Sequence, residues 1–446
     1  MNEQQWPRLE RCLSQLARDQ IEKDPALFVL EAWLYLVRQN FAGVAACVQK
    51  IETLNATSPP EALANVRYVK GQFETLKGLV HYLSADGKAA LASTQRALRV
   101  IPMNHKRARL FADLYQLGAY QMIGKLETGL SSYQKGMERH FNRDKNYHAM
   151  YLGSLGLIHW IDANLMALEQ TAECLLDISK EHPLPGTVCF GFYSLGLAQY
   201  QRNELQHAEE MLSKVVKIHY ADNPMTFAHS AYALALIHQF QGKPDRAREI
   251  VQSVVQDSLE TNNTDMLIVA RAFEAELALH QGHLTRATRW VEEYHAHPFM
   301  PPFRFYMPQL TAVKVSLAQN TAESRRRAAD LLDQLHDFLE SIHNKRFQID
   351  VLALQALLQD AQGEKADAVE KLSQALVLAE PGGFIRVFVD LGPPMAELLK
   401  RLLRETVSVA YIGRILAGFK RDEIRAMQDN PFTLGRTRHH HVPNPW

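Results

Sequence analysis

The sequence predicts an all-α fold, a right-handed superhelix of about nine helical hairpins closed by a C-terminal capping segment. Three observations predict it. Small residues recur in pairs twelve positions apart, the second member of the pair recurs every 38 to 41 residues, and turn-forming Asn or Gly lies between the two members. So regular a step over eight units is typical of a helical repeat array, in which stacked hairpins share one continuous core.

The stretch from Phe192 to Val216 shows the repeating unit most clearly. Gly196 lies on a first helix, Asn203 marks the turn, and Ala208 lies on a second helix. A Gly or Ala at the crossing point lets the two helices approach, because no larger side chain separates their backbones. The unit resembles a tetratricopeptide repeat (TPR), although its step exceeds the 34 residues of the standard repeat. The second-helix positions are Ala90, Leu130, Leu168, Ala208, Ala247, Ala287, Ala328 and Ala368.

The repeat spacing also divides the chain. We expect an N-terminal helix that leads into the array over residues 1–24, the TPR-like superhelix over 25–380, a capping segment with terminal helices over 381–419, and a disordered tail over 420–446. The Pro-rich connection at 296–308 is the strongest interruption of the array.

Composition and motifs favour a binding protein over an enzyme. The chain is 47% hydrophobic with a formal net charge of zero, so it can bury a core but shows no general attraction to nucleic acid. It has no apolar run long enough for a membrane span and no secretory signal. Four scattered cysteines are typical of reduced thiols, so we expect a cytoplasmic protein. Because phosphate-loop, metalloprotease and nucleophile motifs are missing, we expect no catalytic residues, no cofactor and no metal site, even at the histidine run 439–441.

The concave surface of the array is the candidate binding site. Fixed offsets from the crossing residue select the first-helix positions that face it. In the middle units these positions are aromatic with a few polar groups, as in small-molecule sites, whereas outer units give blander sets that include Asp350. The alternative is that the same aromatics pack between adjacent first helices. The candidate ligand-binding residues are Tyr115, Trp160, Phe190, Tyr193, Tyr200, His229, Tyr232 and Gln239.

The C-terminal segment carries a more specific signal. It reads AEPGGFIRVFVDLGPPMAELLKRLL and continues to YIGRILAGF. This resembles the end of the helical sensor domain of MalT-like transcription regulators, the large ATP-binding members of the LuxR group. The matching residues are Gly383, Phe384, Arg386, Phe388, Asp390, Gly392, Met395, Leu398, Leu399, Tyr411, Ile415, Leu416 and Phe419. The stretch from Trp6 to Phe41 also resembles the start of that domain, so the resemblance covers about residues 5 to 420.

This segment, with Phe384, Arg386, Phe388 and Asp390 at its centre, would act as a cap. A repeat array leaves an apolar face open at its end, and the two phenylalanines can fold back onto it. Residues 381–392 read as a short β-rich segment, after which two prolines reset the chain direction and a last amphipathic helix begins.

The resemblance implies a regulatory sensor that binds a small inducer on its concave face and controls self-association. Family members also carry an upstream nucleotide-binding module and a downstream helix-turn-helix, which this sequence lacks. We therefore expect no DNA binding or ATP hydrolysis by this chain itself, and read it as an excised domain, a truncated regulator or a standalone relative. The alternative is a TPR scaffold that binds a peptide or a partner protein. A local, partly enclosed aromatic site would favour the sensor, and an extended groove rimmed by charges would favour the scaffold.

Overall fold

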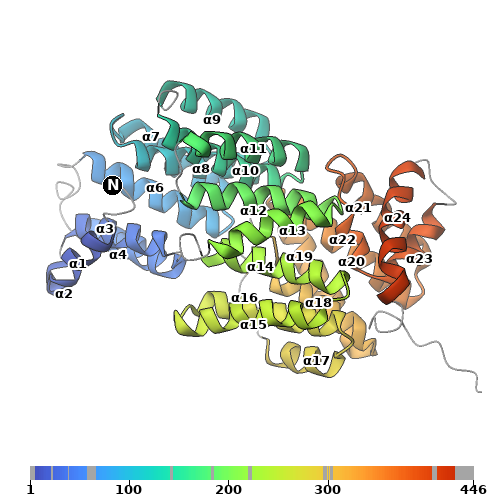
Figure 1. The fold of residues 1–446 in the computed structure, drawn as a ribbon. Coiled ribbons are helices and arrows are strands. Elements are labelled where there is room, and N and C mark those ends of the chain that lie inside the picture. Colours follow the sequence, from blue (N-terminus) through green and yellow to red (C-terminus); the bar gives the residue numbers. More distant parts are fainter. Residues whose placement is uncertain are drawn as a thin grey trace, which may run out of the picture.

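The secondary structure of the protein is entirely helical wherever it is described, which confirms the predicted all-α superhelix (Figure 1). The computed structural model describes residues 6–21, 24–38, 40–57, 67–140, 144–181, 185–218, 224–294, 299, 301, 305–403 and 409–426.

Nine antiparallel helical hairpins follow one another through the described residues, as the repeat spacing predicted. Two short helices, α1 (Trp6–Ser14) and α2 (Arg18–Ile21), precede them. The hairpins are α3 (Pro25–Val37) with α4 (Phe41–Thr57), α6 (Arg67–Leu83) with α7 (Gly87–Val100), α8 (Lys106–Met122) with α9 (Leu126–His140), α10 (Lys145–Ile161) with α11 (Leu165–Glu181), α12 (Pro185–Gln201) with α13 (Leu205–Lys217), α14 (Pro224–Phe240) with α15 (Pro244–Glu260), α16 (Thr264–His280) with α17 (Leu284–Glu293), α18 (Pro308–Gln319) with α19 (Ala322–Ser341), and α20 (Lys345–Gln362) with α21 (Lys365–Ala379).

The turn inside a hairpin depends on one residue with a left-handed backbone. Eight hairpins, from α6–α7 onward, have such a residue at the turn. Gly and Asn adopt this conformation at lower cost than other residues, and they occupy six of the eight turns. The residues are Ala85, Gly124, Ala163, Asn203, Gly242, Gly282, Asn320 and Gly363.

Small residues hold the two helices of a hairpin close together. A Cβ added to Gly196 would lie 2.7 Å from Cγ of Leu212, and one added to Gly78 would lie 2.6 Å from Cγ2 of Thr94. Both distances are shorter than van der Waals contact, so a larger side chain would push the helices apart. The crossing positions of the sequence analysis therefore correspond to real helix contacts.

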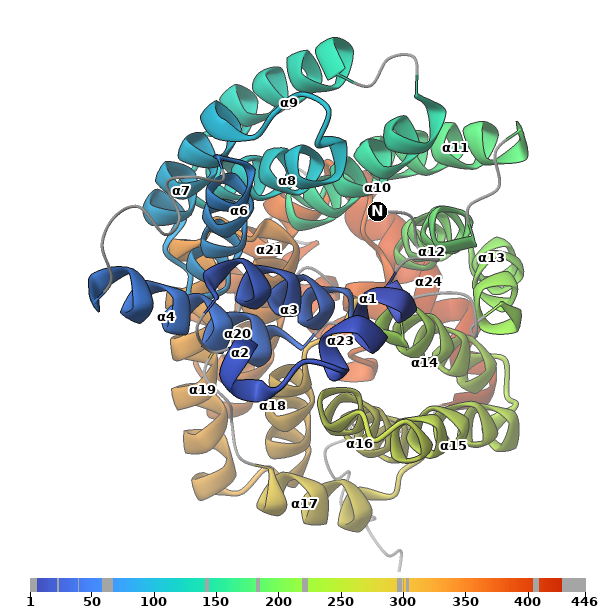
Figure 2. The same cartoon turned by 90° about the vertical axis from the view of Figure 1, so that its left-hand side faces the viewer.

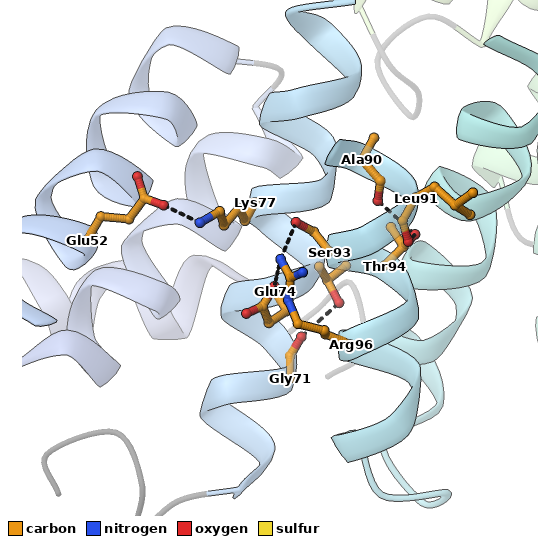
Figure 3. A network of polar contacts seen from close by, with 10 residues as sticks. Glu52, Gly71, Glu74, Lys77, Ala90, Leu91, Ser93, Thr94 and Arg96 are labelled. Carbon is orange, nitrogen blue, oxygen red and sulfur yellow. Dashed lines mark hydrogen bonds and ion pairs between the residues drawn. The ribbon is translucent and has the colours of Figure 1, made fainter. Parts of the chain in front are cut away.

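Polar side chains join neighbouring helices of the first two hairpins (Figure 3). Lys77 on α6 pairs with Glu52 on α4, and Arg96 on α7 donates from Nε to Glu74 on α6 at 3.0 Å. These groups are partly solvent-exposed, and exposed ion pairs contribute at most about 1 kcal/mol each. Stability of the hairpin stack therefore rests mainly on the buried apolar contacts.

The superhelix turns back until its eighth and ninth hairpins touch its third and fourth (Figure 2). Nε2 of Gln121, at the end of α8, donates to the carbonyl oxygen of His343 at 2.7 Å, and the Nδ1 atom of His343 lies 3.0 Å from the carbonyl oxygen of Met122. Nζ of Lys345 lies 2.7 Å from a carboxylate oxygen of Asp162. These contacts close the array on itself and enclose the side chains on its inner face.

The cap differs from the prediction in its secondary structure. The expected β-rich segment is a helical turn, α22 (Arg386–Val389), because its apolar residues pack inward from a tight turn and find no neighbouring strand to pair with. Two further helices follow, α23 (Pro393–Leu402) and α24 (Val409–Ala426). Pro393 and Pro394 occupy the first turn of α23, where their missing N–H groups cost nothing. Residues 427–446 of the expected tail, with the histidine run, lie outside the described residues.

Candidate functional site

A small cavity lies inside the closed superhelix, where the cap meets the middle and late hairpins. Its volume is about 50 Å³. Side chains from α12, α14, α16, α18, α20 and α22 line it, together with the connection that precedes α18. The lining residues are Tyr200, Gln201, Tyr232, Leu236, Glu276, Phe305, Tyr306, Met307, Leu310, Lys314, Arg346, Phe347, Asp350, Leu354, Val387, Asp390 and Leu391.

Residues Phe305–Met307, here called the strap, line the cavity from the connection that precedes α18. The Phe305 ring meets Tyr200 edge-on at 5.4 Å between centroids and lies 6.4 Å from both Trp160 and Tyr232. The Tyr306 ring lies 5.1 Å from Tyr232. The strap therefore places its two aromatic rings among aromatic side chains of the middle hairpins.

Three ion pairs surround the cavity, and their charged side chains are deeply buried. Glu276 on α16 pairs with Lys314 on α18, Arg346 pairs with Asp350 along α20, and Arg386 pairs with Asp390 in the cap. Arg386 is fully buried and Arg346 is 3% exposed. Burying charges is costly unless they are paired and hydrogen-bonded, and replacement by apolar residues would often stabilise a fold. Five of these six charged side chains line the cavity, and the sixth, Arg386, pairs with the lining residue Asp390, so the cavity wall is charged as well as aromatic.

Electrostatics keep the Glu276–Lys314 pair ionised. Burial pushes the pKa of Glu276 upward, but Lys314, the nearby His280 and hydrogen bonds from Lys314 and Thr311 outweigh it, so that pKa lies below its ordinary value. Burial pushes the pKa of Lys314 downward, but pairing with Glu276 outweighs this and raises it. For Asp350 burial dominates, and its pKa is raised despite Arg346. The cavity thus holds fixed charges of both signs.

Polar groups on the last turn of α12 connect the cavity to the cap. The Tyr200 hydroxyl donates to Oδ2 of Asp390 at 2.6 Å, and the backbone N–H of Ile385 donates to the carbonyl oxygen of Gln201 at 2.6 Å. Oε1 of Gln201 is buried and has no hydrogen-bond partner among the described residues. A buried amide oxygen without a donor costs stability, which makes it a group that a ligand donor would satisfy.

The structure brings together half of the predicted ligand-binding residues. Tyr200 and Tyr232 line the cavity. Trp160 lies against the strap and under the guanidinium of Arg346, whose carbon is 4.9 Å from the ring centroid. The His229 ring lies 6.5 Å from that of Tyr306.

The other predicted ligand-binding residues lie elsewhere. Phe190 and Tyr193 pack against each other at 5.9 Å between centroids, outside the cavity lining. Tyr115 belongs to the N-terminal core and contacts Phe111. Gln239 accepts a hydrogen bond from Gln281 at 2.9 Å, near the hairpin turns.

The cap residues reach further than the end of the array. Phe384 and Phe388 are fully buried, and the Phe384 ring lies 6.5 Å from that of Trp160 on α10. The guanidinium of Arg386 lies 4.0 Å from the ring centroid of Phe240 on α14 and donates to Asn203 at 3.2 Å. The cap therefore packs on middle hairpins as well as on α20 and α21, because the superhelix closes on itself.

Sequence reasoning missed the charged half of the site. Glu276, Lys314 and Arg346 lie on first helices whose buried positions are mostly apolar, and a charge on such a face is the available sequence signal. The sequence offset places Asp350 on the concave side but does not distinguish it from its neighbours. In the sequence the strap is recognisable only as part of a Pro-rich interruption, because no local pattern shows that a connection folds inward.

Two kinds of feature are absent from the residues that the structure describes. These residues contain no cluster of three or more His, Cys, Asp or Glu side chains able to hold a metal ion. None of their helices is both long enough and apolar enough to cross a bilayer.

Comparisons with known proteins give the chain a family. A family profile described as the MalT-like TPR region matches residues 71–405, which is most of the chain. The HTH-type transcriptional regulator MalT of Serratia proteamaculans is 24% identical over 411 residues, which are 89% of this chain and 44% of that protein. MalT of Yersinia enterocolitica is 22% identical over 417 residues, 90% of this chain and 44% of that protein. This chain thus spans less than half the length of these relatives.

One similar solved structure is that of a Rap protein complexed with the competence and sporulation factor. It has a TM-score of 0.40 and 13% sequence identity, and the match covers 88% of this chain and 98% of that one. The resemblance seen in the C-terminal segment agrees with the family profile, which extends into the cap as far as residue 405. The chain belongs to the family of MalT-like TPR regions.

Proposed function

We propose that this chain is the ligand-sensing region of a MalT-like transcription regulator. It binds a small inducer inside the superhelix, and binding controls self-association of the regulator. The observation that carries the proposal is the cavity at the meeting point of α12, α20 and the cap, lined by aromatic rings and buried ion pairs. A local, enclosed cavity with aromatic and charged side chains in its wall is typical of small-molecule sites.

The position of the cavity suggests how binding would be transmitted. A ligand there touches groups from several hairpins and from α22, which are far apart in sequence. The cap in turn supports α24, because the Tyr411 hydroxyl donates to the carbonyl oxygen of Phe384. A ligand that prefers one spacing of these elements over another shifts the population toward it, and with it the surface offered by the last helix.

The same lining argues against catalysis. The acidic and basic side chains around the cavity already pair with each other, which suits them to orient a ligand and leaves no carboxylate poised as a general base. We therefore propose a binding role without enzymatic activity.

A thermal-shift screen of sugars and of small aromatic and aliphatic metabolites tests the proposal. A compound that binds only the folded state raises the melting temperature by mass action. We expect at least one hit that also changes the oligomeric state measured by light scattering. If no compound stabilises the protein, the proposal that it binds a small inducer fails. If every hit leaves the oligomeric state unchanged, the proposal that binding controls self-association fails.

A scaffold that binds a peptide is the second candidate. It is favoured by the strap itself, since Met307 has an extended backbone and lies on the concave side as a bound peptide would. Stabilisation by peptides and by no small molecule in the same screen would favour this candidate over the first.

A further inference from the structure

The strap makes polar as well as aromatic contacts inside the superhelix. The Tyr306 hydroxyl and Oγ1 of Thr311 are hydrogen-bonded to each other, and Thr311 donates to Glu276. A threonine hydroxyl has a single hydrogen, so Thr311 must accept from Tyr306. The phenol of the strap is therefore the outer donor of a relay that ends at the buried Glu276–Lys314 pair.

The space beside the strap is too small for an inducer. A cavity of about 50 Å³ holds one or two water molecules, whereas ligand pockets measure several hundred cubic ångströms. Some side chains must therefore leave before a ligand enters. Phe305 and Tyr306 are the groups best placed to do so, because they lie on a connection outside the helices, whereas the other aromatics belong to packed hairpins.

We propose that Phe305 and Tyr306 occupy the inducer site as an internal substitute, and that the inducer is an aromatic molecule with a hydroxyl that donates to Thr311. This inference rests on the proposed function. The rings of Tyr200, Tyr232 and Phe273 form the walls that now hold the strap, with the Tyr306 and Phe273 centroids 4.6 Å apart. Walls complementary to an aryl side chain are complementary to an aryl ligand of similar size.

Two hydrogen-bond acceptors at the site restrict the chemical class of the ligand further. After the strap leaves, Thr311 lacks the donor that Tyr306 supplied, and Oε1 of Gln201 is a second acceptor without a partner among the described residues. A ligand with one phenol-like hydroxyl satisfies Thr311, and a second donor group at its other end satisfies Gln201. A ligand without hydrogen-bond donors would leave both oxygens unsatisfied, which costs affinity.

The test uses side-chain analogues as probes and the full chain as the protein. In the variant F305A/Y306A, we expect isothermal titration calorimetry to show binding of p-cresol and of toluene, the analogues of Tyr and Phe, because emptied apolar cavities bind small aromatic molecules. Adding Thr311→Val should weaken p-cresol about tenfold and leave toluene unchanged. Wild-type protein should bind p-cresol at least about tenfold more weakly than F305A/Y306A, because the ring must displace the strap.

Two further variants keep the test decisive. Phe73→Ala empties a comparable aromatic position in the N-terminal core and should bind the two probes without a Thr311-dependent preference. Tyr306→Phe keeps the ring but removes the donor, so a strap that competes with the ligand should let p-cresol bind more tightly than in wild type. This variant provides the answer if F305A/Y306A does not fold.

Three results would overturn the proposal. In the first, the wild type and both strap variants bind p-cresol with equal affinity. In the second, F305A/Y306A does not bind p-cresol. In the third, Thr311→Val does not change the affinity of F305A/Y306A for p-cresol. A screening hit that stabilises wild type while hydrogen exchange at residues 305–310 stays unchanged would also overturn it, yet leave the proposed function standing. Failure of the proposed function has a different signature, namely that no compound stabilises the wild type although p-cresol binds F305A/Y306A.

Discussion

The hydroxyl of Tyr200 donates a hydrogen bond to Oδ2 of Asp390 at 2.6 Å, and 190 positions of sequence separate the two residues. Burial, and next the charge of Asp390, raise the pKa of Tyr200, so the phenol stays protonated and remains a donor. Asp390 also pairs with the fully buried Arg386. This short contact joins the fifth hairpin to the cap and forms part of the cavity wall.

A double-mutant cycle of Tyr200→Phe and Asp390→Asn should show strong coupling between these residues. Tyr200→Phe removes the donor and Asp390→Asn removes the charge of the acceptor, both while conserving shape, so the double variant loses little more than either single variant. We expect a coupling free energy of about 1–3 kcal/mol in chemical denaturation, as for hydrogen bonds to buried charged groups. Additive effects within about 0.5 kcal/mol would show that the contact does not hold the cap.

Gly196→Leu should destabilise the fifth hairpin. Its Cβ would lie 2.7 Å from Leu212, so the helices must separate or strain, at a cost of roughly 2–4 kcal/mol in the free energy of unfolding. Gly413→Ala on α24 is the matched control, because no atom lies within 4 Å of its added Cβ. A helix favours Ala over Gly, so the control should be neutral or slightly stabilising. Thermal melts in which both variants behave like wild type would refute the crossing assignment.

Phe384→Ala should loosen the cap and the middle hairpins together. Phe384 is fully buried, so its loss should cost about 3–5 kcal/mol. Because it contacts Trp160 as well as the C-terminal hairpins, hydrogen exchange should quicken near residues 155–165 and also over residues 380–400. The partly buried Phe192 on α12 is a suitable control for the same substitution. Faster exchange confined to the last hairpin would indicate an end cap without contact across the superhelix.

Asp113 should make stability depend on pH in a defined window. Burial raises its pKa to about 6, although the Tyr151 hydroxyl and Arg109 oppose this shift. Between about pH 4 and pH 6 the folded state therefore binds more protons than the unfolded state, and this contribution to stability falls as pH rises. Asp113→Asn should gain stability relative to wild type across that window, by roughly 2–3 kcal/mol in total, in urea titrations at several pH values.

His280 supplies a control of opposite sign. Burial lowers its pKa to about 4, so the unfolded state binds the proton first and the wild type loses stability as pH falls below about 6.5. The stability of His280→Gln relative to wild type should therefore increase toward low pH, whereas that of Asp113→Asn increases toward neutral pH. If the difference between Asp113→Asn and wild type does not change with pH, Asp113 titrates normally in the folded state.

The sequence was sufficient to predict the helical hairpins but not the contacts inside the closed superhelix. Local signals such as Gly196, Asn203 and the 40-residue step report contacts between helices adjacent in sequence, and these set the hairpins. The closure contacts of Gln121 with His343 and of Tyr200 with Asp390 depend on the summed rotation of many hairpins, which no local pattern records. The fixed offset selected Tyr200 and Tyr232, which line the cavity. It also selected Tyr115, which belongs to the N-terminal core, and Phe190, which lies on the same helix as Tyr200 but packs against Tyr193 outside the cavity lining.

The most direct test of the central claim compares two glutamines. Gln201 faces the cavity with a buried acceptor, and Gln239 lies near the hairpin turns bonded to Gln281. The measurement is the calorimetric affinity of the first small-molecule hit for Gln201→Leu, for Gln239→Leu and for wild type. Sensing inside the closed superhelix predicts a loss of about tenfold or more for Gln201→Leu and unchanged affinity for Gln239→Leu. The reverse pattern would place the ligand on the open concave rim and contradict an interior site.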